Sequence, residues 1–242
     1  MQEKPLSDNK LSRRTLVAIA LIVLVIPATI LFGVFFLGDR RYYFISLLII
    51  LYTMLPFIMV FEKRKPQARE LIVIAVLAAI AVAGRAAFFM LPQFKPVVAI
   101  VIIAGLCFGA ETGFLVGAVT GFVSNFFFGQ GPWTPWQMFC FGIIGFLAGI
   151  LFKKGVLQKE KLPLCIFGGL ATFFVYGGII DLGSVLMFTP KFSWQALMAT
   201  YISGFWFNIV HAAATVFFLL VISQPMIEKL DRIKIKYGLI ER

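Results

Sequence analysis

The sequence has 242 residues, of which 61% are apolar and only 14% charged, and its mean hydropathy is +0.97. Soluble domains have about half apolar and about a quarter charged residues, so this composition excludes an ordinary soluble domain and indicates an all-α integral membrane protein. In a soluble chain the net charge of +11 would suggest nucleic-acid binding. Here it indicates cytoplasmic connections rich in Lys and Arg, and we expect no nucleic-acid partner.

The first predicted element is a membrane anchor at residues 15–37, directly after the basic stretch KLSRRT. Its apolar run is longer than the roughly 7–15 residues of a signal peptide and has no small-residue cleavage site, so we expect it to remain in the protein. Further apolar segments follow at 42–61, 70–91, 97–128, 136–152, 163–187 and 194–222.

The segment at 97–128 is too long for one span. As a single helix it would measure roughly 48 Å at 1.5 Å per residue, against a hydrocarbon core of roughly 30 Å. Glu111 and Thr112 interrupt it, so the alternative is two short helices joined by a tight turn. The basic residues decide between the two, because Lys and Arg collect on the cytoplasmic side of a membrane.

With two helices the chain has eight spans, and 17 of its 22 Lys and Arg residues fall on one side of the membrane. With one long helix the split is nearly even. We therefore predict eight transmembrane helices with both termini in the cytoplasm. The basic segments that then share the cytoplasmic side are the N-terminus (1–14), two connections (62–69 and 153–162) and the C-terminal tail (223–242).

The opposite, extracellular face is predicted to carry the connections at 91–96, 129–135 and 188–193. The second of these begins the uncharged stretch GQGPWTPWQ, in which prolines restrict the backbone and aromatic and amide side chains are available for binding. We expect this loop to hold a solute. The alternative is that Trp133 and Trp136 only form part of the aromatic belt at the membrane interface.

Two ladders of small residues repeat at every fourth position. The first, on the third span, comprises Ala75, Ala79, Ala83 and Ala87. The second, across the fourth and fifth spans, comprises Gly105, Gly109, Gly113, Gly117 and Gly121. Small residues let another helix approach closely, so each ladder either packs helices within the chain or forms a docking face for another membrane protein.

Polar residues inside the predicted spans are few, and each is a candidate for function. They are Arg85, Asn125, Tyr176, Asp181, Asn208 and His211. Arg85 either reaches the membrane surface or faces an internal cavity, and a pair with Asp181 is one option. His211 either bonds a neighbouring helix or contacts a ligand. The three cysteines show neither metal-ligand spacing nor a disulfide framework, so we expect no metal site.

The chain lacks the motifs of common enzyme classes. It has no GxxxxGK[ST] loop for ATP, no HExxH zinc pair and no GxSxG elbow, so we expect no catalytic residues. It shows neither the charged rings or backbone filter of a channel nor the two similar halves of many secondary transporters. What remains is a membrane protein that binds a solute at its outer face and takes energy from elsewhere, with a stand-alone secondary transporter as the alternative.

Residues 84–151 carry a resemblance to a known family. The most specific stretches are QFKPV, GFLVGA and SNFFFGQGPWTPWQM, which resemble the substrate-specific S component of energy-coupling factor (ECF) transporters. The resemblance implies a six-helix core at 70–222, preceded by two additional helices at 15–61, in a bacterial cell membrane.

The resemblance also implies partners. The family's small-residue AxxxA stripe matches Ala75, Ala79 and Ala83, and extends to Ala87. These residues are then expected to dock on a transmembrane coupling subunit, which works with two cytoplasmic ATPases. The S component of such a complex topples within the membrane to carry its vitamin inward. No catalytic cofactor is implied.

By the same resemblance, the substrate lies beneath the three extracellular connections. The candidate contacts are Gln130, Trp133, Thr134, Trp136 and Gln137, with Asn125 beneath them and Arg85, Tyr176 and Asn208 as further candidates. The GQGPWTPWQ stretch resembles that of S components linked to cobalamin uptake, so the implied ligand is cobalamin or a related corrinoid. The alternative is another vitamin or micronutrient. Folate or pantothenate would need a cation, which Arg85 could supply.

Overall fold

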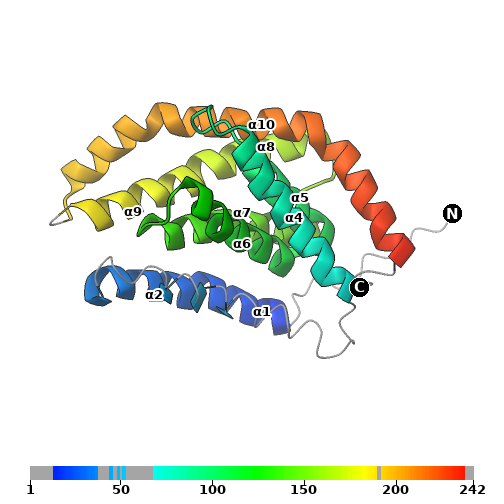
Figure 1. Cartoon of the computed structure of the whole chain (residues 1–242), viewed down its shortest axis with the longest axis horizontal. Helices are drawn as coiled ribbons and strands as arrows, with labels where there is room; N and C mark the ends of the chain where they lie inside the picture. The colour runs from blue at the N-terminus through cyan, green and yellow to red at the C-terminus, as the bar shows by residue number, and fades with distance from the viewer. Residues whose placement is uncertain are drawn as a thin grey trace.

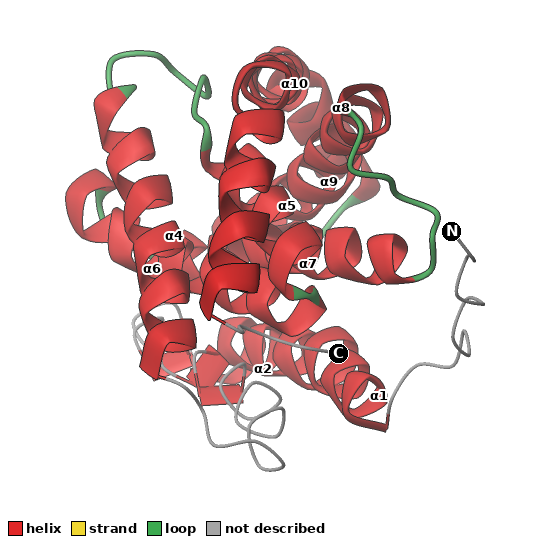
Figure 2. Cartoon of the chain, turned by 90° about the vertical axis from the view of Figure 1, so that its right-hand side faces the viewer, coloured by secondary structure: helices red, strands yellow, loops and turns green. Residues whose placement is uncertain are grey.

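The computed structural model describes residues 13–37, 44–45, 48–49, 51–52, 68–189 and 192–237. Every regular element in these residues is a helix (Figure 1, Figure 2), in agreement with the all-α prediction. Within this part of the chain, five helices are long and apolar enough to cross a membrane. They are Leu16–Phe36, Ala110–Phe128, Trp133–Lys153, Lys161–Phe188 and Trp194–Tyr237.

The described residues form seven continuous helices, some of which contain π-helical turns labelled η. In chain order the elements are α1 (Arg13–Ala20), η1 (Leu21–Val25), α2 (Ile26–Phe32) and η2 (Gly33–Leu37) as one helix, α4 (Ala68–Ala87), α5 (Val97–Phe108), α6 (Ala110–Phe128), α7 (Trp133–Lys153), α8 (Lys161–Leu170) with η4 (Ala171–Gly177) and α9 (Gly178–Phe188), and α10 (Trp194–Tyr237). The predicted second span at 42–61 lies mostly outside the described residues, so the total of eight is not confirmed.

The long apolar segment breaks at Gly109. Its φ of 100° lies in the left-handed region that favours glycine. Gly109 donates its N–H to the carbonyl of Gly105 at 2.9 Å and accepts the N–H of Gly113 at 3.0 Å. The predicted tight turn is therefore confirmed, but its predicted position at Glu111 and Thr112 is wrong, because both residues already belong to the first turn of α6.

Helix α5 lies at the centre of the bundle. All of its 12 residues are buried, as expected for a helix that is apolar on every side. Figure 2, which looks along the bundle, shows α5 and α7 enclosed by the other helices. At about 1.5 Å per residue α5 measures only about 18 Å, so it is shorter than the full span predicted for this position.

The glycine ladder packs helices within the chain. A Cβ atom at Gly105 would lie 2.1 Å from the carbonyl oxygen of Gly145, and one at Gly113 would lie 2.5 Å from the same oxygen. A Cβ atom at Gly117 would lie 2.5 Å from the carbonyl carbon of Phe141. Helices α5, α6 and α7 therefore touch backbone to backbone, and the within-chain alternative holds for this ladder.

The N-terminal helix, from α1 to η2, lies along α6 and α7 (Figure 1). Its buried apolar side chains repeat at every fourth position, namely Ala18, Ile22, Ile26 and Ile30. This spacing places them on one face, which packs against the core. The other faces expose Leu, Val and Phe side chains, as suits a helix that contacts lipid. Residues 1–12 of the predicted cytoplasmic N-terminus lie outside the described residues.

Helix α10 is longer than the span predicted at 194–222. It has 44 residues and contains Pro225, and at about 1.5 Å per residue it measures about 66 Å. Residues 223–237 of the predicted C-terminal tail therefore continue the helix. In Figure 1 this part of α10 turns down past the end of the bundle that carries α1 and the start of α4.

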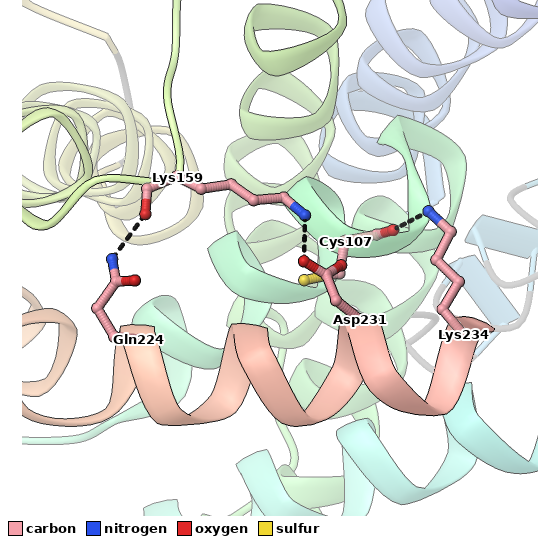
Figure 3. Close-up of polar contacts among 5 residues, drawn as sticks. All are labelled: Cys107, Lys159, Gln224, Asp231 and Lys234. Carbon is pink, nitrogen blue, oxygen red and sulfur yellow. Dashed lines mark hydrogen bonds and ion pairs between the residues drawn. The ribbon is translucent and has the colours of Figure 1, made fainter. Parts of the chain in front are cut away.

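Three side chains hold this end of α10 against the bundle (Figure 3). Asp231 pairs with Lys159, with 2.6 Å between Oδ2 and Nζ. Gln224 donates from Nε2 to the backbone carbonyl of Lys159 at 2.6 Å, and Lys234 donates from Nζ to the carbonyl of Cys107 at 3.0 Å. The end of α10 is thus bound to both the α7–α8 connection and the last turn of α5.

Candidate functional site

A cavity of about 250 Å³ lies among α4, the start of α5, α6, α7, η4, α10 and the connection at 88–96. Six of its lining side chains are polar: Arg85, Gln93, Lys95, Gln137, Tyr176 and His211. Three are phenylalanines: Phe89, Phe128 and Phe141. Apolar walls with a few convergent polar groups are typical of small-molecule sites, and the volume lies just below their usual range of roughly 300–1,000 Å³.

Arg85 lies in the last turn of α4 and reaches toward α6. Its Nη1 donates to Ser124 Oγ at 2.5 Å and to Asn125 Oδ1 at 2.8 Å, and the guanidinium lies 4.4 Å from the ring centroid of Phe128. All three partners belong to α6, so the charged group is held in one position at the cavity wall. Of its two predicted alternatives, Arg85 adopts the one that faces a cavity.

Lys95 belongs to the connection between α4 and α5. Its Nζ donates to the backbone carbonyls of Phe88 and Leu91, and to that of Phe89 at 3.4 Å. It therefore holds together the turn that follows α4, which ends at Ala87. Burial, together with the nearby charge of Arg85, lowers the pKa of Lys95 below its ordinary value.

Aromatic rings form the walls of the cavity. The centroids of Phe141 and Tyr176 lie 5.0 Å apart, and the rings of Tyr176 and His211 meet edge to face at 4.6 Å. Phe89 and Phe128 lie 5.2 Å apart on the other side. Tyr176 and His211 are both buried, so these contacts join η4 to α10 and fix the shape of the cavity.

Gln137 on α7 carries a buried acceptor that points to a missing partner. Its Oε1 accepts no hydrogen bond from the described residues. Leaving a buried acceptor unpaired costs about 1–3 kcal/mol, and such atoms call for an explanation. Because Gln137 lines the cavity, this acceptor is available to a group inside it.

The GQGPWTPWQ stretch forms a shorter loop than the sequence predicts. Helix α6 ends at Phe128 and α7 begins at Trp133, so only residues 129–132 connect the two helices. Pro135 is tolerated in α7 because the first turn of a helix does not need its N–H. None of residues 129–136 lines the cavity, which leaves Gln137 as the member of this stretch that does.

Thr134 organises this connection. Its Oγ1 accepts a hydrogen bond from Asn125 Nδ2 at 3.0 Å and donates to Gln130 Oε1 at 2.9 Å, and Gln130 Nε2 donates to the carbonyl of Phe122 at 2.9 Å. Asn125 in turn accepts from Arg85. Three predicted substrate contacts therefore form a network that supports Arg85, and their direct contact with a ligand stays a prediction.

The two tryptophans of the stretch differ in environment. Trp133 is 37% exposed and donates from Nε1 to the carbonyl of Gly129 at 3.3 Å. Trp136 is buried against Gly183 of α9, where a Cβ atom would lie 2.7 Å from its ring. Trp133 is placed as the aromatic-belt alternative expects, and Trp136 joins α7 to α9.

Asn208 and Asp181 form a separate contact between α9 and α10. Asn208 Nδ2 donates to Asp181 Oδ2 at 2.8 Å, and neither residue lines the cavity. The predicted pair of Asp181 with Arg85 is therefore wrong. The role of Asn208 as a substrate contact stays a prediction that this position does not favour.

The alanine ladder of α4 faces outward. Its members are all exposed: Ala75, Ala79, Ala83 and Ala87. The residues that α4 buries lie on another face: Ile74, Leu77, Ala78 and Ala81. Figure 2 shows α4 at the outer edge of the bundle. The described part of the chain does not cover the ladder, so it is available to another helix.

A family model described as "ECF transporter, substrate-specific component" matches residues 69–223. This range exceeds half of the chain and contains every residue that lines the cavity. The chain belongs to this family. The family is that of a transporter's substrate-specific component rather than an enzyme, which agrees with the several apolar helices and indicates a multi-pass membrane protein.

This S component is also similar to proteins of the UPF0397 group. One from Vibrio atlanticus (strain LGP32) is 32% identical over 124 residues, which cover 48% of this chain and 68% of the relative. One from Aliivibrio fischeri (strain MJ11) is 31% identical over 136 residues, which cover 51% of this chain and 74% of the relative. No solved structure gives a significant match.

Several lining residues of the S component do not stand out in its sequence, namely Phe89, Gln93, Lys95, Phe128 and Phe141. Gln93 and Lys95 had a signal in QFKPV, and Phe128 had one in SNFFFGQGPWTPWQM, because both stretches resemble the family. Phe89 and Phe141 had a weaker one, because the chain contains 28 phenylalanines. Among the described residues no cluster of His, Cys, Asp and Glu is placed to hold a metal ion.

Proposed function

We propose that this S component binds a small solute in its cavity and delivers it inward as part of an ATP-driven ECF importer. The cavity carries the proposal: polar side chains from elements far apart in the sequence converge there with aromatic rings. Such convergence is typical of binding sites, and it occurs in a chain whose family is that of substrate-specific components.

The proposed partners are a transmembrane coupling subunit and two cytoplasmic ATPases. The exposed alanine ladder of α4 supports this assembly, because small residues allow close helix contact without polar bonds. A contact of this kind suits repeated release and redocking, as toppling in the membrane requires. The proposed location is the bacterial cell membrane with both termini in the cytoplasm, because the α7–α8 connection and the basic end of α10 lie together.

The prediction of cobalamin or a related corrinoid rests on the resemblance of the GQGPWTPWQ stretch. The cavity favours a smaller ligand, since about 250 Å³ is less than a corrin ring with its side chains occupies. Of that stretch, moreover, Gln137 alone lines the cavity. We therefore place a smaller vitamin or micronutrient first and keep cobalamin as the comparison ligand.

Assembly tests the proposed function without knowledge of the ligand. The full chain, with an affinity tag, is co-expressed with the coupling subunit and ATPases of the same bacterium and purified in detergent. We expect all four proteins to co-purify. Recovery of the tagged chain alone would reject the importer and instead support a stand-alone secondary transporter.

A further inference from the structure

We infer that the solute carries an anionic group, a carboxylate or a phosphate, on a planar aromatic body, and that Arg85 and Lys95 bind the anion. The inference rests on the proposed function, because it names the substrate class of the same cavity. It is carried by the charge of the lining, the unused donors of Arg85, and the aromatic walls with their unsatisfied acceptor.

The lining of the cavity is positively charged. Arg85 and Lys95 both contribute to it, whereas no Asp or Glu side chain of the described residues does. In the part of the chain that the structure describes, neither cation forms an ion pair with a carboxylate. Arg85 is part-buried, and a cation withdrawn from water is costly without a counter-ion, which an anionic solute would supply.

Arg85 keeps donors for such an anion. Its two hydrogen bonds, to Ser124 and Asn125, both come from Nη1, and both acceptors are uncharged. Its Nε and Nη2 make no hydrogen bond to the described residues. These two nitrogens form a fork that fits a carboxylate or phosphate with two parallel bonds. Because α6 already holds the side chain, binding costs little conformational entropy.

Lys95 supplies a second positive charge. Its ammonium group is held by backbone carbonyls of Phe88, Phe89 and Leu91, so its position beside the cavity is fixed. We expect Lys95 to strengthen anion binding mainly through its electrostatic field, and Arg85 to act through direct hydrogen bonds.

The rest of the lining selects the body of the solute. Phe89, Phe128, Phe141 and Tyr176 offer ring faces and edges, against which a planar heterocycle packs favourably. Gln137 Oε1 lacks a donor, and an N–H or O–H on that heterocycle would satisfy it. A lipid head group offers the anion without the planar body, so a soluble aromatic anion matches the lining better.

Matched ligand pairs test the role of the charge. The purified full chain in nanodiscs is titrated with flavin mononucleotide against riboflavin, nicotinate against nicotinamide, and pterin carboxylate against pterin, with cobalamin as a large comparison ligand. We expect at least one anion to bind at least about tenfold more tightly than its neutral partner. Nanodiscs with and without anionic phosphatidylglycerol show whether a lipid phosphate occupies the site instead.

Substitutions then test whether Arg85 and Lys95 cause the preference for an anion over its neutral partner. Arg85→Gln and Lys95→Gln should each remove most of the difference in affinity between an anion and its neutral partner. Arg85→Lys should retain only part of this difference, because lysine lacks the fork of two parallel donors. Arg232→Gln is the matched control, because its side chain is 83% exposed at the far end of α10 and the net charge changes equally. Thermal unfolding without ligand verifies that each variant is folded.

Equal binding within every pair, or binding of an anion that Arg85→Gln and Lys95→Gln leave unchanged, would overturn the inference. The absence of binding by all three anions would also overturn it. So would occupation of the site by the phosphate of phosphatidylglycerol alone. These results would not contradict the proposed importer function if the chain still co-purifies with its coupling subunit. Failure of that assembly would reject the proposed function, whatever the binding assays show.

Discussion

Two ladders of small residues repeat at every fourth position in this S component, and the structure uses them in opposite ways. The glycine ladder is buried where α5 and α6 meet the backbone of α7. The alanine ladder of α4 is exposed on the outside of the bundle. Spacing alone therefore does not distinguish a contact within the chain from a surface that is available to a partner.

The surroundings of each ladder make the difference. Helix α7 carries its own glycines, Gly145 and Gly149, opposite the glycine ladder, so backbones meet on both sides. On α4 the exposed alanines alternate with Val76 and Ile80, which are exposed as well. Alanines also let a second helix approach closely, but no partner helix of the described residues packs on them, so the contact is free to form with another protein and to be released.

The largest effect is expected at the buried ladder. In Gly113→Ala the new Cβ would lie 2.5 Å from the carbonyl oxygen of Gly145 and 2.6 Å from Cα of Gly105. Because backbone atoms on both sides cannot move aside, we expect the free energy of unfolding to fall by more than the about 1–3 kcal/mol of ordinary overpacking. Thermal unfolding in detergent measures the change.

Gly178→Ala is the matched control. Nothing lies within 4 Å of a Cβ atom there, and alanine is the better helix former by about 1 kcal/mol. This variant should unfold at the same temperature as the parent or higher. Equal losses in both variants would mean that the glycines act through flexibility and not through close packing.

The next prediction compares two adjacent residues of α4. Ala78 is buried at 4% exposure and Ala79 is exposed. Ala78→Leu should overpack the core and lower the free energy of unfolding by about 1–3 kcal/mol, whereas Ala79→Leu should change it by less than about 0.5 kcal/mol. If the two variants lose the same free energy of unfolding, α4 does not bury Ala78 and expose Ala79 as the structure shows.

A smaller free-energy change is expected at the docking face. The double variant Ala79→Leu, Ala83→Leu should keep its fold and its ligand binding but lose affinity for the coupling subunit by at least about tenfold, because bulky residues separate the helices. Co-purification measures the loss. Ala213→Leu, at an exposed alanine of α10, is the control, and an equal loss in it would show that the ladder is not the docking surface.

The sequence predicted much of the fold through its charges. The distribution of Lys and Arg required a turn within 97–128, and the structure has one. The exact position was missed because the break depends on the φ of Gly109, and every fourth residue of that segment is a glycine. The length of α10 was missed because its end is polar, and its helix is held by contacts with Lys159 and Cys107 that are distant in sequence.

The lining residues that were predicted as contacts had two kinds of signal. Arg85 and Tyr176 interrupt apolar spans, and Gln137 belongs to the GQGPWTPWQ stretch that resembles the family; all three line the cavity. The GQGPWTPWQ stretch was predicted as a loop, but most of it is the first turn and a half of α7, and its contact with a ligand stays a prediction. A proline-rich stretch resembles a loop in sequence, although proline is also common at the start of a helix.

The smallest effect is expected far from both ladders, at the pair of Asp231 and Lys159. The two side chains are 33% and 34% exposed, so water and salt weaken their attraction, and Asp231→Asn should cost less than about 1 kcal/mol. The bonds of Gln224 and Lys234 to backbone carbonyls stay in place in this variant.

Limited trypsin digestion of residues 223–237 should therefore accelerate slightly in Asp231→Asn, while the unfolding temperature of the bundle stays the same. Glu228→Gln is the control, because its contact with Arg232 spans 4.0 Å between mostly exposed side chains. If Asp231→Asn instead lowers the unfolding temperature as much as Gly113→Ala does, the end of α10 is part of the core. The difference between the buried glycine ladder, on which folding depends, and outer contacts that can be lost without unfolding would then not hold at this end of the molecule.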